Sequence, residues 1–288
     1  MGIPIREQTI LTSHGSIAVA EHGRSGIPVV MIHGNSFSRD VFRHQLTGRL
    51  AENHRLIAFD LPGHGQSGNA LDAMRSYTRP GLADAAVELL EGLGVSEAIV
   101  LGWSLGGHVA VEMMSRFSGI RGLMLTGAPP VGRNGMAQGF KGSAHSGLAG
   151  RQDLSETEID AFVQAIFGRS AEPVLREAVA RADGRFRKRL FEAARAGEGV
   201  DQRLIVESSP VPLAVVNGAA DPLINLDYFE TVAYANLWEG QCHRLPGLGH
   251  APFWEAPEDF DPMLERFLRD IEAGRAGPVL KVHQGLRA

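Results

Sequence analysis

Three residues in separate parts of the chain have the types and the order needed for nucleophilic catalysis. Ser104 lies in Gly102-Trp103-Ser104-Leu105-Gly106, a G-x-S-x-G motif between an apolar run and a helical pattern. On a tight strand-to-helix turn such a serine presents its hydroxyl, and the chemistry indicated is acyl transfer. The alternative for the serine alone is a helix N-cap with incidental glycines.

A serine hydroxyl is a weak nucleophile until a base takes its proton. His250, in the loop segment LGHAPFW, is the candidate base, and Asp221, which follows an apolar strand run, is the acid expected to orient it. The order Ser104, Asp221, His250 is the order that accompanies G-x-S-x-G. Glu207 and Asp227 are the nearest competing carboxylates. Both rank lower because Glu207 precedes the strand and Asp227 lies in or near a later helix.

The segment HGNS ends an earlier apolar run and supplies candidate donors for an oxyanion hole. We expect the backbone N–H groups of Asn35 and Leu105 to stabilise the negative oxygen that acyl transfer creates. The alternative for Asn35 is a simple turn residue. His33 is expected to hold this loop by hydrogen bonding, and Asp60 and His64 of DLPGHG are expected to be structural.

The elements that must position these residues alternate along the chain. Short apolar runs predict buried parallel strands, and helical patterns lie between several of them. The runs cover 28–33, 55–59, 98–101, 122–126, 212–216 and 242–245, and helices are expected around 83–90, 108–117 and 259–271. We therefore predict an α/β fold with a mostly parallel, doubly wound sheet.

One long interval contains no strand-like run and is expected to be a helical lid inserted into the core. It spans 129–209, begins with a glycine-rich loop, and continues with a capping-box pattern at Ser155 and Glu158. An arginine-rich helical stretch at 171–196 follows. The expected division is a core of 1–128 and 210–273, the lid of 129–209, and a tail of 274–288.

Composition excludes several classes of function. The net charge is −5 without a basic cluster, so nucleic-acid binding is not expected. A single cysteine excludes an intrachain disulfide, and neither a signal peptide nor a membrane span is expected. The patterns H-x-H-x-D-H, H-E-x-x-H and C-x-x-C are absent, so we expect no metal or other cofactor. The prediction is a cytoplasmic protein acting on a small molecule, with its oligomeric state left open.

The segments HGNS, DLPGHGQS, GWSLGGH, NGAADP and GHAPFWEAP, in this order, resemble the α/β-hydrolase family over residues 10–272. More narrowly, GWSLGGHVAVEMMSR, RGLMLTGAPPV, QGFK, NLWEG and GHAPFWEAPEDFD are similar to N-acyl-homoserine lactonases of the AidH type. This resemblance implies an α/β-hydrolase fold. It also implies a metal-independent enzyme that opens the lactone ring of bacterial quorum-sensing signals.

The resemblance also implies roles for single residues. Ser104 becomes the nucleophile and His250 the base, whereas Asp221 stands where that lactonase has a glutamate. Phe162 is placed where the lactonase has a tyrosine near the substrate. The residues expected to contact substrate are Gly34, Trp103, Phe162 and Ile166, with Phe167 also able to line an apolar slot for the acyl chain. The alternative is that the lid residues only pack the lid on itself.

Three other functions stay open at this point. A general carboxylesterase for short acyl esters, or an amide-cleaving enzyme, would use the same three residues. A small-molecule receptor could use the same fold as a binding cup. Dehalogenases and epoxide hydrolases of this fold need a carboxylate nucleophile, and Ser104 argues against both.

Overall fold

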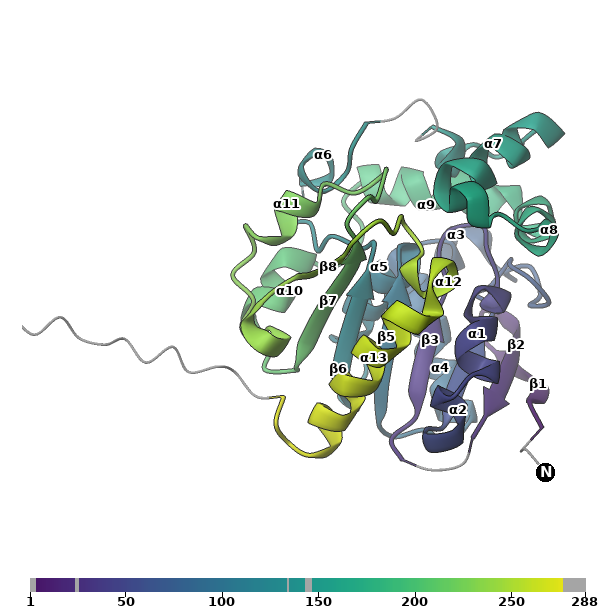
Figure 1. Ribbon diagram of the computed structural model, residues 1–288. Coiled ribbons are helices and arrows are strands. Elements are labelled where there is room, and N and C mark those ends of the chain that lie inside the picture. Colours follow the sequence, from purple (N-terminus) through teal and green to yellow (C-terminus); the bar gives the residue numbers. More distant parts are fainter. Residues whose placement is uncertain (1–3, 24–25, 134, 143–146, 277–288) are drawn as a thin grey trace, which may run out of the picture.

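The computed structural model describes residues 4–23, 26–133, 135–142 and 147–276. Eight strands form one sheet in the order β1-β2-β4-β3-β5-β6-β7-β8, shown in Figure 1. Neighbours from β4 through β8 pair in parallel, whereas β1 and β2 add an antiparallel edge. The strands are β1 (Arg6–Thr12), β2 (Gly15–His22), β3 (Val29–Ile32), β4 (Leu56–Phe59), β5 (Ala98–Trp103), β6 (Ile120–Thr126), β7 (Leu213–Gly218) and β8 (His243–Leu245). The predicted α/β fold with a mostly parallel sheet is confirmed.

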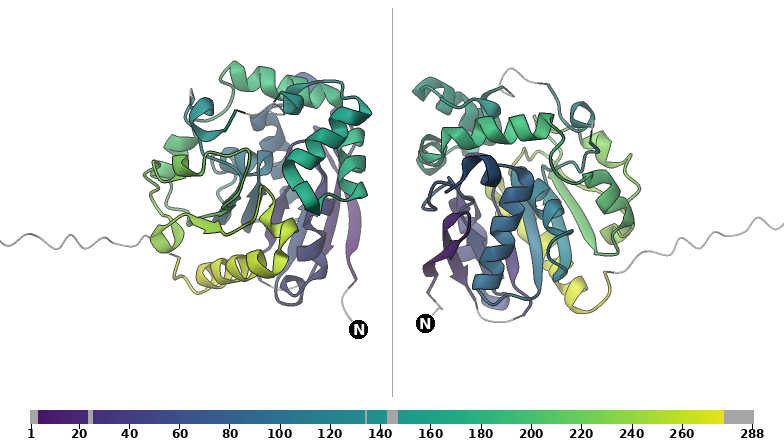
Figure 2. Two further views of the ribbon diagram at one scale, coloured as in Figure 1. Left: turned by 45° about the horizontal axis from the view of Figure 1, so that its top comes forward. Right: turned by 180° about the vertical axis from the view of Figure 1, so that it is seen from behind.

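Apolar side chains on both faces of the sheet explain why helices cover both. In β3, Val30 and Ile32 belong to one buried cluster, while Val29 and Met31 belong to the other, as the alternation of a strand requires. One cluster receives α4 (Arg79–Gly92), α5 (Leu105–Met113), α10 (Gln202–Ser208) and α11 (Leu226–Phe229). The other receives α1 (Arg43–Thr47), α2 (Leu50–Asn53), α12 (Pro252–Glu255) and α13 (Pro257–Glu272). Figure 1 shows the layer with α1, α12 and α13 in front of the sheet, and the right-hand view of Figure 2 shows the molecule from behind.

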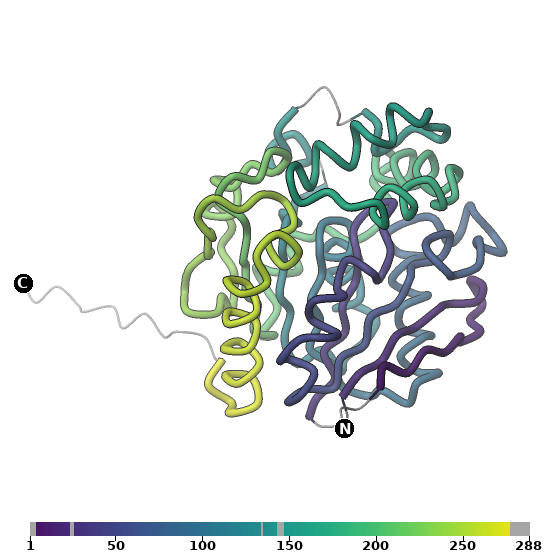
Figure 3. The backbone as a smooth tube through the Cα atoms, turned by 45° about the vertical axis from the view of Figure 1, so that its right-hand side comes forward, coloured from purple at the N-terminus to yellow at the C-terminus, as the bar shows by residue number. Residues whose placement is uncertain are grey.

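The chain between β6 and β7 is largely helical, and its helices α7, α8 and α9 lie across one end of the sheet (Figures 1 and 3). Its elements are α6 (Met136–Gly139), η2 (Leu148–Gly150), α7 (Glu156–Phe167), η3 (Gly168–Ser170), α8 (Pro173–Arg181), α9 (Gly184–Arg195) and α10. Helix α10 packs against α5 of the sheet layer. We call residues 129–209 the insert. The short elements elsewhere are η1 (Arg39–Phe42), α3 (Ala73–Ser76) and η4 (Trp238–Gly240).

The capping box expected in the insert is present at the start of α7. The Ser155 hydroxyl accepts from the Glu158 backbone, and the Glu158 carboxylate accepts from the Ser155 backbone. This reciprocal pair satisfies two N–H groups that the first turn of a helix leaves free.

Several expected boundaries were wrong. The stretch 171–196 contains two helices, because α8 ends at Arg181 and Asp183 caps the start of α9 by accepting from the Arg185 N–H. The helix expected at 108–117 begins earlier, at Leu105, directly after Ser104, and ends at Met113. Strands β1 and β2 were not expected. In the described ranges no helix combines the length and apolar character that a membrane span needs.

Candidate active site

Ser104 stands on a strained turn between β5 and α5. Its φ is 52° and its ψ is −117°, and its N–H donates to the Thr126 carbonyl at 2.8 Å. A non-glycine residue in this region costs about 1–3 kcal/mol and persists where the surroundings hold it. The flanking glycines are needed for space, because a Cβ on Gly102 would strike Gly107 and a Cβ on Gly106 would strike the Ile32 carbonyl.

His250 and Asp221 form a buried pair beside this turn. The distance from His250 Nδ1 to Asp221 Oδ2 is 2.7 Å, and the two side chains are 2% and 1% exposed. Asp221 Oδ1 accepts from the N–H groups of Leu223 and Ile224 at 2.8 and 3.1 Å. Burial alone would raise the pKa of Asp221, but His250 and these hydrogen bonds bring it below its usual value. The ionised carboxylate therefore holds the proton of the imidazole on Nδ1 and leaves Nε2 as the basic nitrogen.

Three hydrogen bonds fix the backbone of the loop that carries His250. Trp103 Nε1 donates to the His250 carbonyl at 2.9 Å. Glu255 accepts from the N–H of Gly249 at 2.8 Å and from the N–H of Ala251 at 3.1 Å. One carboxylate therefore binds the backbone on both sides of the histidine. This role of Glu255 was not predicted from the sequence. The spacing of five residues from His250 to Glu255 in GHAPFWE is the only signal for it.

Gly127 leaves room for the imidazole. Its φ is 63°, and a Cβ at this position would lie 2.6 Å from His250 Cε1. Its N–H donates to Asn217 Oδ1 at 2.7 Å. The ends of β6 and β7 therefore shape the space in which His250 sits.

Asn35 and Leu105 both line one cavity together with Ser104. Leu105 is the first residue of α5, where backbone N–H groups lack partners within the helix. The Asn35 side chain is engaged elsewhere. Its Nδ2 donates to the Ala149 carbonyl of η2 at 3.0 Å, and its Oδ1 accepts from the Ser36 hydroxyl at 2.8 Å. Any donation from Asn35 to a substrate oxygen therefore falls to its backbone N–H.

Arg187 of α9 joins the insert to the loop that carries Asn35. This side chain is buried, and it donates to the Ser36 hydroxyl at 3.3 Å and to the carbonyls of Arg151 and Gln152 at 2.8 and 2.9 Å. Burial lowers the pKa of Arg187. Because Ser36 in turn donates to Asn35, a chain of hydrogen bonds runs from α9 to the expected oxyanion hole. No local sequence pattern signals this connection.

His33, His64 and Asp60 lie under this loop and do not line the cavity. His33 Nε2 accepts from the Leu61 N–H at 3.0 Å, and burial lowers the pKa of His33 and of His64. Asp60 accepts from the Arg39 backbone N–H at 2.7 Å and also pairs with its guanidinium. These contacts fit the structural roles expected for the three residues.

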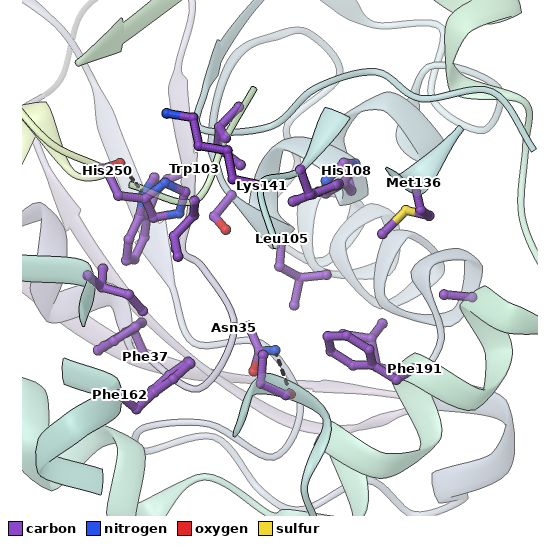
Figure 4. A pocket seen from close by; sticks show the side chains of 18 of the residues that line it. Asn35, Phe37, Trp103, Leu105, His108, Met136, Lys141, Phe162, Phe191 and His250 are labelled. Carbon is purple, nitrogen blue, oxygen red and sulfur yellow. Dashed lines mark hydrogen bonds between the residues drawn. The ribbon is translucent and has the colours of Figure 1, made fainter. Parts of the chain in front are cut away.

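The cavity has a volume of about 520 Å³ and a mostly apolar lining (Figure 4). The expected contact residues Trp103, Phe162 and Ile166 line it, together with His250. Gly34 does not line it, but a Cβ there would lie 2.9 Å from the Trp103 ring. Phe167 also lies outside the lining and packs with Phe37 and Trp103 at ring-centroid distances of 5.1 and 5.7 Å.

Several lining residues were not expected. They are Phe37, Arg79, His108, Met136, Ala137, Phe140, Lys141, Gly142, Ala149, Leu190, Phe191, Ala194, Leu223 and Ile224. Lys141 donates from Nζ to the Asp221 carbonyl at 2.8 Å, and its N–H donates to the Leu223 carbonyl at 2.7 Å. The QGFK segment was the signal for Phe140 and Lys141, although its place beside Asp221 was not foreseen.

The competing carboxylates lie in ion pairs of their own. Glu207 pairs with Arg203 at 2.8 Å and Asp227 with Arg244 at 2.9 Å, and the Asp227 side chain is 87% exposed. Asp221 is therefore the carboxylate that the fold brings to His250. Within the described ranges, no group of three His, Cys, Asp or Glu side chains is arranged to hold a metal ion.

A sequence model of the alpha/beta hydrolase family matches residues 29–262, and the chain belongs to this family. The sheet with helices on both sides is the α/β-hydrolase fold that the sequence resemblance implied. Among solved structures, the chain is similar to the N-acyl homoserine lactonase AidH in complex with N-butanoyl homoserine. The TM-score is 0.91 and the identity 46%, covering 93% of this chain and 97% of that one.

Esterases are more distant relatives. The esterase RhEst1 from Rhodococcus sp. ECU1013 is 26% identical with a TM-score of 0.78, covering 93% of this chain and 100% of that one. A pimeloyl-[acyl-carrier protein] methyl ester esterase from Yersinia pseudotuberculosis serotype O:1b (strain IP 31758) is 27% identical over 86% of this chain and 95% of its own length.

Proposed function

We propose that this chain is a serine hydrolase that opens the lactone ring of N-acyl homoserine lactones, and so degrades bacterial quorum-sensing signals. The observation that carries the proposal is His250, which is paired with buried Asp221 and lines the same cavity as Ser104. The likeness to a lactonase at 46% identity supports the choice of substrate. We further propose that the protein acts in the cytoplasm.

The first step is attack of Ser104 Oγ on the lactone carbonyl carbon. His250 Nε2 takes the hydroxyl proton, and the carbonyl oxygen becomes an oxyanion that accepts from the backbone N–H groups of Asn35 and Leu105. One such donor contributes about 10²–10³ in rate. Asp221 stabilises the imidazolium that forms, and its low pKa keeps it ionised throughout.

The second step breaks the ring C–O bond. His250 returns its proton to the departing ring oxygen, which becomes a hydroxyl still attached to the acyl group on Ser104. Because this hydroxyl can attack the acyl-enzyme and close the ring again, water must hydrolyse the ester first. His250 then deprotonates that water as it attacks the acyl carbon, and returns the proton to Ser104 Oγ when the ester bond to Ser104 breaks. The product is an N-acyl homoserine with its amide intact.

Mass spectrometry of the products tests this proposal. A lactonase yields one product that is one water heavier than the substrate, and acidification closes the ring and restores the lactone. Cleavage of the amide would yield homoserine lactone and a fatty acid, and acid would restore nothing. The Ser104→Ala variant is the matched control and should leave the substrate intact.

A general carboxylesterase is the second candidate, and the esterase relatives favour it. Rates on N-acyl homoserine lactones and on p-nitrophenyl esters of matched acyl length separate the two. Turnover of the aryl esters without any turnover of the lactones would replace the first proposal with the second.

A further inference from the structure

The cavity has two chemically different arms, which lie on either side of Asn35 and Leu105 in Figure 4. We call the side near His250 the aromatic arm, defined by Phe37, Trp103, Phe162 and Ile166. The side along α5 is the α5 arm, defined by His108, Met136, Phe191 and Arg79. In the aromatic arm Phe37 and Phe162 stack with ring centroids 5.9 Å apart. In the α5 arm polar side chains stand among apolar ones.

The chemistry of acyl transfer assigns the two ends of a substrate to these arms. The leaving oxygen must reach His250, because this residue gives it a proton. The part of the substrate on the other side of the reacting carbonyl then points away from His250, over Leu105 and toward His108. In a homoserine lactone the ring oxygen would then face the aromatic arm, and the α-carbon, which carries the acylamino chain, would face the α5 arm. This differs from the sequence-based expectation, which set the acyl chain against Phe162 and Ile166.

His108 is held as a neutral hydrogen-bond acceptor at the side of this arm. Gln202 Nε2 donates to the His108 carbonyl at 2.9 Å, which turns Gln202 Oε1 toward His108 Nδ1 at 2.6 Å. Because an amide oxygen only accepts, Nδ1 carries the proton and Nε2 has the free lone pair. Burial lowers the pKa of His108 to about 4, so the ring stays neutral at pH 7. A neutral imidazole nitrogen in an apolar cavity favours a ligand that donates a hydrogen bond.

Arg79 also lines this arm. Its Nη2 donates to the Glu198 carbonyl at 2.9 Å, and its Nε lies 3.8 Å from Glu112 Oε1. Within the described residues, this buried Nε has no hydrogen-bond partner. Because this Nε has almost no accessible surface, a ligand in the cavity does not reach it. Since Glu112 already balances this charge, the pair fits a neutral group better than an anion.

We propose that the α5 arm binds the acyl chain of the substrate and selects chains that carry a hydroxyl group. A hydroxyl on the chain can donate to His108 Nε2. An unsubstituted chain would leave this lone pair without a ligand partner. This inference rests on the proposed hydrolase function and adds a substrate class to it.

The test compares N-acyl homoserine lactones of one chain length that carry a hydroxyl at the third carbon, near the middle, at the end, or nowhere. The ratio of kcat/KM for each hydroxylated chain to kcat/KM for the plain chain is the readout. We expect at least one isomer to be preferred by about three- to tenfold, as one net hydrogen bond allows. Equal values for all isomers would overturn the inference.

Variants locate the preference. In His108→Phe the ratio should fall to about one, and in Gln202→Leu, which frees the imidazole from its fixed tautomer, it should fall in the same direction. The control is His44→Phe, because His44 lies on α1 outside the cavity lining and packs on Trp254 with an aromatic contact that phenylalanine retains. A ratio unchanged in His108→Phe and Gln202→Leu would contradict the assignment.

The same ratios measured on p-nitrophenyl esters keep the two proposals separable. If lactones are not hydrolysed but p-nitrophenyl esters with hydroxylated acyl chains are preferred, the lactonase proposal fails. The inference that the α5 arm selects hydroxylated chains then stands. If lactones are opened without a preference for any hydroxylated chain, the lactonase proposal stands and the α5 arm fails.

Discussion

His250 Nδ1 lies 2.7 Å from Asp221 Oδ2, and the other oxygen of Asp221 accepts two backbone N–H groups. Each oxygen of the carboxylate thus has a distinct task, one orienting the imidazole and the other anchoring the acid to its own loop. The pair comes from loops after β7 and β8, which are parallel neighbours in the sheet. This arrangement brings residues 29 positions apart into one buried unit.

Asp221→Asn should lower kcat by about 10⁴-fold, because an amide can hold the imidazole in the wrong tautomer. Steady-state kinetics on a lactone or an aryl ester measures this. The matched control is Asp227→Asn, an exposed aspartate paired with Arg244, which should retain activity. Equal activity in Asp221→Asn and the wild type would remove Asp221 from the mechanism.

Gly127→Ala should lower kcat at least tenfold with the fold retained, since the added methyl would lie 2.6 Å from His250 Cε1 and push the ring aside. Gly94→Ala separates this effect from backbone strain. Gly94 also has positive φ, 66°, but a Cβ there meets nothing within 4 Å. Both variants should lose about 1 kcal/mol of stability, and only Gly127→Ala should lose activity. Similar kinetics in the two variants would show that the crowding of His250 is unimportant.

Arg187→Met should weaken both the fold and the reaction. The change removes the hydrogen bonds from this buried side chain to the carbonyls of Arg151 and Gln152, each of which contributes about 0.5–1.5 kcal/mol net. It also removes the contact with Ser36 that supports Asn35. Urea unfolding and kcat on one ester measure the two effects. Lys188→Met, an exposed neighbour on α9, is the control. If Arg187→Met keeps both its stability and its full kcat, the insert does not support the loop that carries Asn35.

The free energy of unfolding should fall as the pH drops below about 6.5. Burial lowers the pKa values of His33, His64 and His108 from their ordinary 6.5, in the case of His108 to about 4. Between these limits the unfolded chain binds protons that the folded chain does not, so stability rises with pH and levels off above 6.5. Each such histidine contributes a slope of up to about 1.4 kcal/mol per pH unit. Urea unfolding on both sides of pH 6.5 checks this, and His108→Phe should flatten the curve.

The sequence predicted the parts of the site that depend on local patterns. The turn at Ser104 was indicated by the apolar run before it and the glycines around it. The chain order of Ser104, Asp221 and His250 indicated that they meet at one edge of the sheet. The capping box at Ser155 was found for the same reason, since all its contacts lie within one helical turn.

What the sequence did not predict depends on contacts between distant residues. Asn35 meets Ala149 across 114 positions, and Arg187 meets Ser36 across 151. No local periodicity encodes such contacts, so neither the anchoring of the Asn35 loop by the insert nor the α5 arm of the cavity was foreseen. Strand β1 was missed because its side chains are mostly exposed or half-buried and it lacks the continuous apolar run of the central strands.

The most direct test of the account is the mass of the intact protein after rapid acid quenching during turnover of an N-acyl homoserine lactone. When Ser104 opens the ring, the released alcohol stays attached to the acyl group on the enzyme. We therefore expect an adduct with the mass of the whole lactone, mapped to the peptide containing Ser104. Ser104→Ala should form no adduct and turn over no substrate. An adduct with the mass of the fatty acyl group alone, or turnover by Ser104→Ala at the wild-type rate, would contradict the account.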